Sequence, residues 1–138
     1  MLFMTKLSMI VSSDKLDRIY PAIILASSAA TMGWDVEIFF TFFGLLALSK
    51  KHQVSSLSID YKEYDETFKE AISKGAMPKW DEMIINAKKT GKLKIFACTT
   101  TMGLFKVSKD DIRDFVDDFA GAVTFLDRSK NSDINLFF

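Results

Sequence analysis

The sequence predicts a three-layer α/β/α sandwich built on a mostly parallel sheet of about five strands. Strand-like and helix-like segments alternate along the chain, which is typical of strands joined by crossover helices. The strand-like segments are apolar without strict two-residue alternation, which indicates a sheet covered on both faces. With 138 residues, 49% of them hydrophobic, the chain is long enough for one core, so we expect a single domain over residues 1–138.

The first third of the chain carries the signals of two strand–helix units. Two runs of β-branched and aromatic residues each lead into a helical pattern. Gly33 follows the first helix as a typical C-cap, whereas Pro21 inside that helix should kink it or delay its start. In order, the expected strand, helix, strand and short apolar helix are residues 6–12, 14–32, 34–41 and 42–49.

Residues 50–75 differ in character, because they are polar and densely charged. We interpret them as a surface insertion and expect them to be the most mobile part of the chain. An amphipathic stretch with Tyr64, Phe68 and Ile72 on one side can still dock as a lid over the strand ends.

The remainder predicts a second series of alternating elements. Pro78 opens a helix that Gly91 ends, and the strand after it stops at Cys98. The hydroxyls of Thr99, Thr100 and Thr101 are candidate N-caps for the next segment, and a capping box at Ser108 predicts a further helix. The expected helix, strand, helix, strand, short helix and last strand are residues 79–90, 92–97, 108–117, 121–125, 126–130 and 133–138.

Composition excludes several classes of function. The 18 basic and 18 acidic side chains leave a formal net charge of zero, which does not favour nucleic acid as a partner. One cysteine and one histidine exclude an intramolecular disulfide and a cysteine-rich zinc site, and we expect no metal. The apolar run at residues 38–48 is too short to span a membrane. No signal peptide is recognisable, so we expect a reduced, cytoplasmic setting.

Ligands of open parallel sheets bind beyond the carboxyl ends of the strands, which directs attention to Cys98. It is the one good nucleophile among the predicted strand-end residues. Backbone N–H groups of a helical turn after it would stabilise its thiolate. Transfer of sulfur needs only such a thiolate, which holds a persulfide until a second thiol collects it. The alternative stays open that Cys98 is a small buried hydrophobe.

Other strand-end residues give weaker indications. Ser12, Ser13 and Thr41 could cradle a phosphate in a flavodoxin-like crevice, although caps and turns are the simpler interpretation. No glycine-rich phosphate motif is present, so we expect no cofactor. Thr124 follows the predicted fourth strand, and His52 has no indicated role beside Cys98. The phenylalanines of the second strand and its end are expected in the core or a subunit interface.

Several segments together resemble the DsrE/DsrF-like family. They are KLSMIVSSDKLDRIYPAIILASSAATMGWDVEIFFTFFGL at residues 6–45, Met77-Pro78, IFACTTTMGLF at 95–105, GAVTFL at 121–126 and the closing INLFF. The similarity is to the branch with an FFTF segment and one cysteine after the third strand, and residues 50–75 are the least family-like part.

This resemblance implies a homo-oligomeric α/β sandwich that acts as a sulfurtransferase or sulfur carrier. It implies that Cys98 carries a persulfide or thiosulfonate within a loop formed by Thr99, Thr100 and Met102. Thr41 and Phe42 are added as candidate binding residues because they follow the predicted second strand. Implied partners are a small TusA-like sulfur carrier and a heterodisulfide-reductase-like complex. The alternative is a non-enzymatic module that binds a small ligand or protein partner through its apolar strand-end surface. We expect self-association through residues 42–48 and the C-terminal Leu136, Phe137 and Phe138.

Overall fold

Five strands form one fully parallel sheet in the order β4-β3-β2-β1-β5. The computed structural model describes residues 5–138. The strands are β1 (Lys6–Val11), β2 (Asp35–Phe40), β3 (Leu93–Cys98), β4 (Asp118–Ala120) and β5 (Ile134–Phe137). The prediction of a parallel sheet of about five strands is therefore confirmed.

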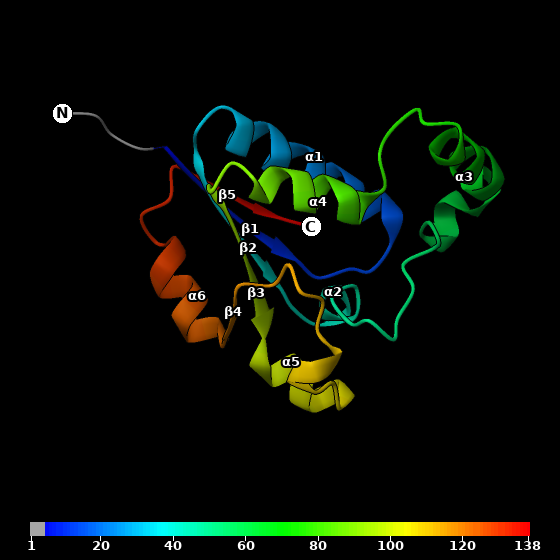
Figure 1. Cartoon of the computed structure of the whole chain (residues 1–138). Coiled ribbons are helices and arrows are strands. Elements are labelled where there is room, and N and C mark those ends of the chain that lie inside the picture. The colour runs from blue at the N-terminus through cyan, green and yellow to red at the C-terminus, as the bar shows by residue number, and fades with distance from the viewer. Residues whose placement is uncertain (1–4) are drawn as a thin grey trace.

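Helices cover both faces of the sheet, as predicted for a three-layer α/β/α sandwich. Helices α1 (Leu16–Thr31) and α4 (Trp80–Lys88) pack together on one face, and α6 (Ala122–Ser129) lies on the other (Figure 1). The chain crosses the sheet in one direction from β1 to β4 and then returns to pair β5 with β1. Because crossovers between parallel strands are right-handed, this reversal places α6 on the face opposite α1 and α4.

The two faces carry cores of different size. The larger core joins α1 and α4 to alternate strand residues, among them Met9, Ile38 and Ile95. The smaller core, beneath α6, contains Phe39, Phe96, Cys98, Ala120 and Phe125. The rings of Phe39 and Phe125 stack with their centroids 4.8 Å apart. Alternation along β3 thus directs Cys98 to the side of α6.

Two short helices lie together beyond the carboxyl ends of the strands: α2 (Phe43–Leu46) and α5 (Thr99–Phe105) (Figure 1). A Cβ at Gly44 would stand 2.1 Å from the carbonyl oxygen of Val11, so only glycine allows α2 this close to β1. Within residues 5–138, no helix combines the length and apolarity needed to cross a bilayer.

Residues 50–75 contain a 3₁₀ helix, η1 (Ile59–Tyr64), and the helix α3 (Asp65–Ser73). Their amphipathic side docks on α1, where Phe68 meets Tyr20 edge to face at 5.4 Å. Asp17 of α1 accepts hydrogen bonds from the Ser58 backbone at 2.5 Å and hydroxyl at 2.8 Å. The expected lid therefore lies against α1 and not over the strand end that holds Cys98.

Three local predictions were wrong. The capping box at Ser108 is present but opens only the single 3₁₀ turn η2 (Lys109–Asp111), because Ile112 is extended and pairs with Ser49. The strand expected at 121–125 is part of α6, whose buried Phe125 and Ser129 have helical spacing. The third is the set of threonine N-caps: α5 begins at Thr99 itself, with Cys98 as its N-cap.

The long first helix follows its prediction more closely. It includes Pro21 in its second turn, and Gly33 ends it with a φ of +87°. Pro21 costs one backbone hydrogen bond, which the buried apolar side of α1 offsets.

Candidate functional site around Cys98

Cys98 joins two elements, as the last residue of β3 and the N-cap of α5. Only 4% of the residue is exposed, since Phe96, Ala120 and Phe125 pack around it. Cys98 is therefore at the expected place in the fold. A sulfur carrier at this position would need a solvent-reachable thiol, but Cys98 is buried, because Ala120 of β4 and Phe125 of α6 pack over this end of the sheet.

The surroundings of the thiol favour its ionised form. Burial raises the pKa of Cys98. The hydroxyls of Thr101 and Thr41 and the backbone N–H groups of Thr101 and Thr100 lower this pKa, because hydrogen bonding from them to the sulfur favours the thiolate. These hydrogen bonds outweigh burial, so the pKa of Cys98 lies below its ordinary value.

Thr101 connects the loops after β2 and β3. Its hydroxyl oxygen lies 3.3 Å from that of Thr41 and accepts a hydrogen bond from the Phe42 backbone N–H at 2.9 Å. Phe42 has a φ of +50° and a ψ of −129°, a strained conformation for a residue with a side chain. The hydrogen bond to Thr101 helps to hold this conformation beside the thiol.

Next to the thiol, three aromatic rings form an exposed surface. Phe42, Phe43 and Phe105 contact one another with centroids 5.0 to 6.3 Å apart, and about half of Phe42 and of Phe43 is exposed. Leu45 and Leu48 are fully buried. The apolar run at 42–48 thus exposes mainly its first two residues, because α2 turns the others into the core except for the half-buried Leu46.

The remaining predicted residues have local roles. The Ser12 hydroxyl donates to the carbonyl of Phe138 at 2.9 Å, and the Ser13 hydroxyl accepts from the Lys15 backbone N–H at 3.1 Å. Ser13 thus stabilises the turn before α1, whereas Ser12 ties the end of β1 to the C-terminal residue. The side chains of Thr99 and Thr100 are exposed, Met102 is buried, and Thr124 lies within α6 and not at a strand end.

Sequence reasoning missed Thr101 as the central hydroxyl of the site. The signal was available, because a residue three positions after a strand-end cysteine returns to that cysteine on the first helical turn. It also missed the partner of His52, whose Nε2 lies 2.9 Å from Asp14 Oδ2. Neither residue is among the groups that hydrogen-bond Cys98. No group of three or more metal-ligating side chains forms within the described residues 5–138.

The fold and the site together place this chain among parallel α/β sandwich proteins with a single thiol at the end of the third strand. The chain belongs to the DsrE/DsrF/DrsH-like family, whose sequence model matches residues 4–68 and 56–137. The expected family is thereby confirmed.

Curated relatives match over nearly the whole chain. Sulfur carrier protein DsrE2 of Allochromatium vinosum is 30% identical over 157 aligned positions, covering 96% of this chain and 97% of that protein. YrkE of Bacillus subtilis, an uncharacterised protein, is 25% identical, with 94% of each chain covered.

Solved structures share the fold at low identity. YchN of E. coli superposes with a TM-score of 0.67 at 12% identity, covering 99% of this chain and 100% of that one. MTH1491 of Methanobacterium thermoautotrophicum gives a TM-score of 0.60 at 13% identity, covering 97% and 99%. These similarities support the fold alone.

Proposed function

We propose that the protein is a sulfur carrier that holds sulfane sulfur on Cys98 and passes it to a partner thiol. One observation carries this proposal: Cys98 ends β3 as the N-cap of α5, beside the hydroxyls of Thr41 and Thr101, and these donors lower its pKa and favour a thiolate. The family and the relative named as a sulfur carrier support it.

Loading is an exchange at sulfur. The Cys98 thiolate attacks a sulfane sulfur of polysulfide or tetrathionate, and a new S–S bond forms as the donor's S–S bond breaks. The electron pair leaves with the shortened polysulfide or with thiosulfate. Cys98 then carries a persulfide or a thiosulfonate.

Unloading reverses the roles of the two thiols. A partner thiolate attacks the outer sulfane sulfur, the bond to Cys98 breaks, and the Cys98 thiolate returns. The hydroxyls of Thr41 and Thr101 stabilise the returning charge. No second catalytic residue and no cofactor is needed for either step.

Because Cys98 is buried, both steps require local opening. The side chains packed around the thiol include Ala120 of β4 and Phe125 of α6, so α6 must move for the sulfur to be reached, and the strained turn at Phe42 lies beside Thr101. We propose that the exposed rings of Phe42, Phe43 and Phe105 receive the partner, a small TusA-like carrier or a heterodisulfide-reductase-like complex. A reducing cytoplasm, the setting we propose, would keep Cys98 free.

Intact mass spectrometry tests the proposal. After incubation with polysulfide, we expect a mass increase of one or more sulfur atoms, and after tetrathionate the addition of a thiosulfonate group, both removed by dithiothreitol. Cys98→Ser should fold but show neither adduct, because serine is nearly isosteric and accepts the same hydrogen bonds. If the wild-type protein gains no mass with either donor, the carrier proposal fails.

A second candidate function is a non-enzymatic binding module. It is favoured by the exposed cluster of Phe42, Phe43 and Phe105, which would bind a ligand or protein without any reaction at sulfur. Binding of a partner that is equal in the wild-type protein and in Cys98→Ser, together with an unreactive thiol, would support this function and not the carrier.

A further inference from the structure

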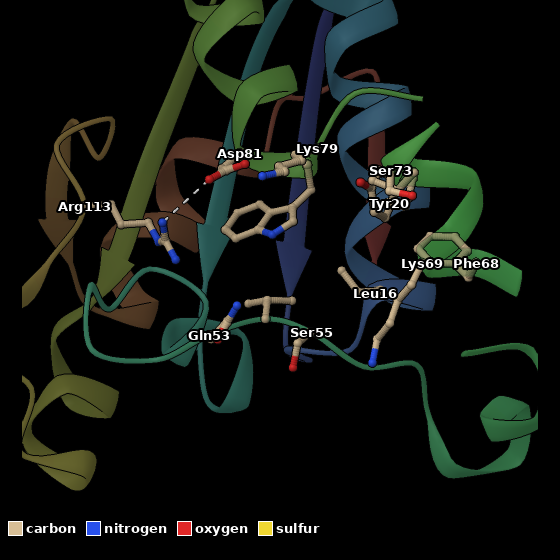
Figure 2. A pocket seen from close by; sticks show the side chains of 13 residues that line it. Leu16, Tyr20, Gln53, Ser55, Phe68, Lys69, Ser73, Lys79, Asp81 and Arg113 are labelled. Carbon is tan, nitrogen blue, oxygen red and sulfur yellow. Dashed lines mark ion pairs between the residues drawn. The ribbon is translucent and has the colours of Figure 1, made fainter. Parts of the chain in front are cut away.

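A cavity lies on the face of the sheet that α1 and α4 cover, opposite the face that holds Cys98. Helices α1, α3 and α4 enclose it together with the extended residues 53–55, and its volume is about 430 Å³ (Figure 2). Small-molecule sites commonly have volumes of this order. The site proposed above has no residue in this cavity.

The cavity wall is largely aromatic and aliphatic. Tyr20 and Phe68 stand edge to face along one side, as Figure 2 shows, and Trp80 contributes a further ring. Leu16 and Ile72 extend this wall. Such a wall favours the flat apolar body of a ligand, because aromatic rings gain from both burial and ring stacking.

Charge in the cavity is predominantly positive. Arg113 and Asp81 neutralise each other, with nitrogen and oxygen 3.8 Å apart, and the guanidinium lies 5.3 Å above the Trp80 ring centroid. Lys69 and Lys79 also line the cavity. Within residues 5–138, no carboxylate oxygen lies within 4.0 Å of either lysine nitrogen.

The backbone adds to this positive character. Helix α4 begins at the cavity, with Lys79 as its N-cap and no side-chain hydrogen bond from that residue; in its first turn, which also carries Asp81 and Glu82, Asp81 Oδ1 accepts only the N–H of Glu82. The start of a helix carries partial positive charge and unpaired N–H groups. The chain as a whole has a formal net charge of zero, so the surplus of two positive charges is a local property of this cavity.

We propose that this cavity binds a small amphipathic anion, a molecule with an aromatic or cyclic apolar body and one carboxylate or sulfonate. The body lies against Tyr20, Phe68 and Trp80, and the anionic group is attracted by Lys69 and Lys79, which reach the cavity from α3 and from the start of α4. Binding here is independent of sulfur transfer at Cys98. Because residues 53–73 supply one side of the cavity, the insertion is the element that creates the site.

A pair of matched probes tests the proposal, 1-naphthaleneacetate and its neutral amide. Each is titrated into ¹⁵N-labelled protein. We expect the acetate to shift the indole N–H of Trp80 and the amides of Ser55 and Phe68, and to leave the indole of Trp34 in place. Trp34 is an internal control, since it does not line the cavity. The acetate should bind about fivefold more tightly than the amide, an advantage expected for partly exposed charges.

Two double variants separate this site from general charge effects. Lys69→Gln/Lys79→Gln should reduce the affinity for the acetate to that for the amide. Lys62→Gln/Lys89→Gln makes the same change of charge on η1 and at the far end of α4, outside the cavity, and should leave both affinities unchanged. The ¹⁵N spectrum of each variant shows directly that it is folded.

Several results would overturn the proposal. The first two are equal affinity of the wild-type protein for acetate and amide, and no binding of either probe at millimolar concentration. The others are spectral shifts confined to other surfaces, such as those around Phe42 or Phe137, and an acetate affinity that is unchanged in Lys69→Gln/Lys79→Gln. In Cys98→Ser the acetate should bind as in the wild-type protein. Failure of the carrier proposal would therefore leave this result unaffected.

Discussion

Glu37 of β2 and Arg128 of α6, 91 residues apart in the chain, form a two-pronged ion pair beneath α6. Arg128 Nε lies 3.1 Å from Glu37 Oε2, and Nη2 donates to Oε1. The guanidinium also lies 5.0 Å from the Phe96 ring centroid. Glu37 is only 6% exposed, so this pair compensates a buried carboxylate and fixes the helix that covers Cys98.

Removing one partner of this pair should destabilise the protein and expose the thiol. For Arg128→Met we expect a loss of about 2 kcal/mol in the free energy of unfolding, measured with urea, and faster labelling of Cys98. The double variant Glu37→Leu/Arg128→Met should recover part of the loss, because the buried carboxylate is also removed and Lys6, whose Nζ lies 3.4 Å from Glu37 Oε2, is partly exposed to water. Lys130→Gln, an exposed control nearby, should change neither the free energy of unfolding nor the labelling rate of Cys98. If Cys98 is labelled as slowly in Arg128→Met as in the wild-type protein, α6 does not have the covering role.

Thr101 should set the reactivity of Cys98. In Thr101→Val the thiol loses a hydroxyl donor, so its pKa should rise and the pH profile of thiol labelling should move upward. Thr100→Val is the matched control, since Thr100 contributes its backbone N–H and its side chain is exposed. Identical profiles for the three proteins would exclude the Thr101 hydroxyl as a determinant of the pKa.

The same shift predicts a pH dependence of stability. The pKa of Cys98 is lower in the folded protein than in the unfolded chain, so the unfolded chain binds more protons between the two values. Stability should therefore increase as pH rises through that window, and Thr101→Val should flatten the increase. Urea unfolding at a series of mildly alkaline pH values measures it, with Cys98→Ser as the reference.

Gly44 and Gly103 should respond in opposite ways to alanine. Gly44→Ala forces a Cβ against the Val11 carbonyl, a backbone atom that cannot move aside, and should cost about 3 kcal/mol or prevent folding. Gly103, inside α5, has no neighbour within 4 Å of a new Cβ, so Gly103→Ala should stabilise by about 0.5 to 1 kcal/mol. Thermal unfolding of both variants measures the contrast, and a stable Gly44→Ala protein would argue against the close packing of α2 on β1.

Asp17 should control the docking of residues 50–75 in acid. Burial raises the pKa of Asp17, but hydrogen bonds from the Ser58 backbone and hydroxyl lower it below its usual value. The tether is therefore intact above the unfolded pKa of about 3.9 and is lost as pH falls through the lower, folded value.

Hydrogen exchange should show less protection of 50–75 than of the central strands at neutral pH, and still less in Asp17→Asn. Protection of this segment equal to that of β2 would contradict its predicted mobility.

Self-association remains a prediction from apolar surface. About half of Phe42 and half of Phe43 is exposed. Phe137, on the edge strand β5, is 68% exposed. We expect an oligomer at micromolar concentration by light scattering, with Phe137→Ser and Phe42→Ser weakening it. A wild-type monomer under these conditions would remove this prediction.

The sequence by itself determined the fold class, the order of most elements and the place of Cys98. These depend on local signals: apolar strand runs, the helical spacing in 16–31, and glycines such as Gly33 and Gly91 at positive φ. Errors arose where a short local signal was outweighed by packing. The capping box at Ser108 begins only one turn because Ile112 pairs with Ser49. The expected strand at 121–125 is the start of α6, because the helix packs Phe125 on Phe39 of the sheet face beneath it.

Only the tertiary structure decided what surrounds Cys98 and where the insertion docks. The partners of the thiol lie 60 residues apart, Thr41 after β2 and Thr101 in α5 after β3, and are joined only because those strands are neighbours in the sheet. Burial under α6 depends on the reversal after β4, which no local pattern encodes. The cavity likewise requires Tyr20, Phe68 and Trp80, from three separate helices, to meet, and such contacts depend on packing over long separations in sequence.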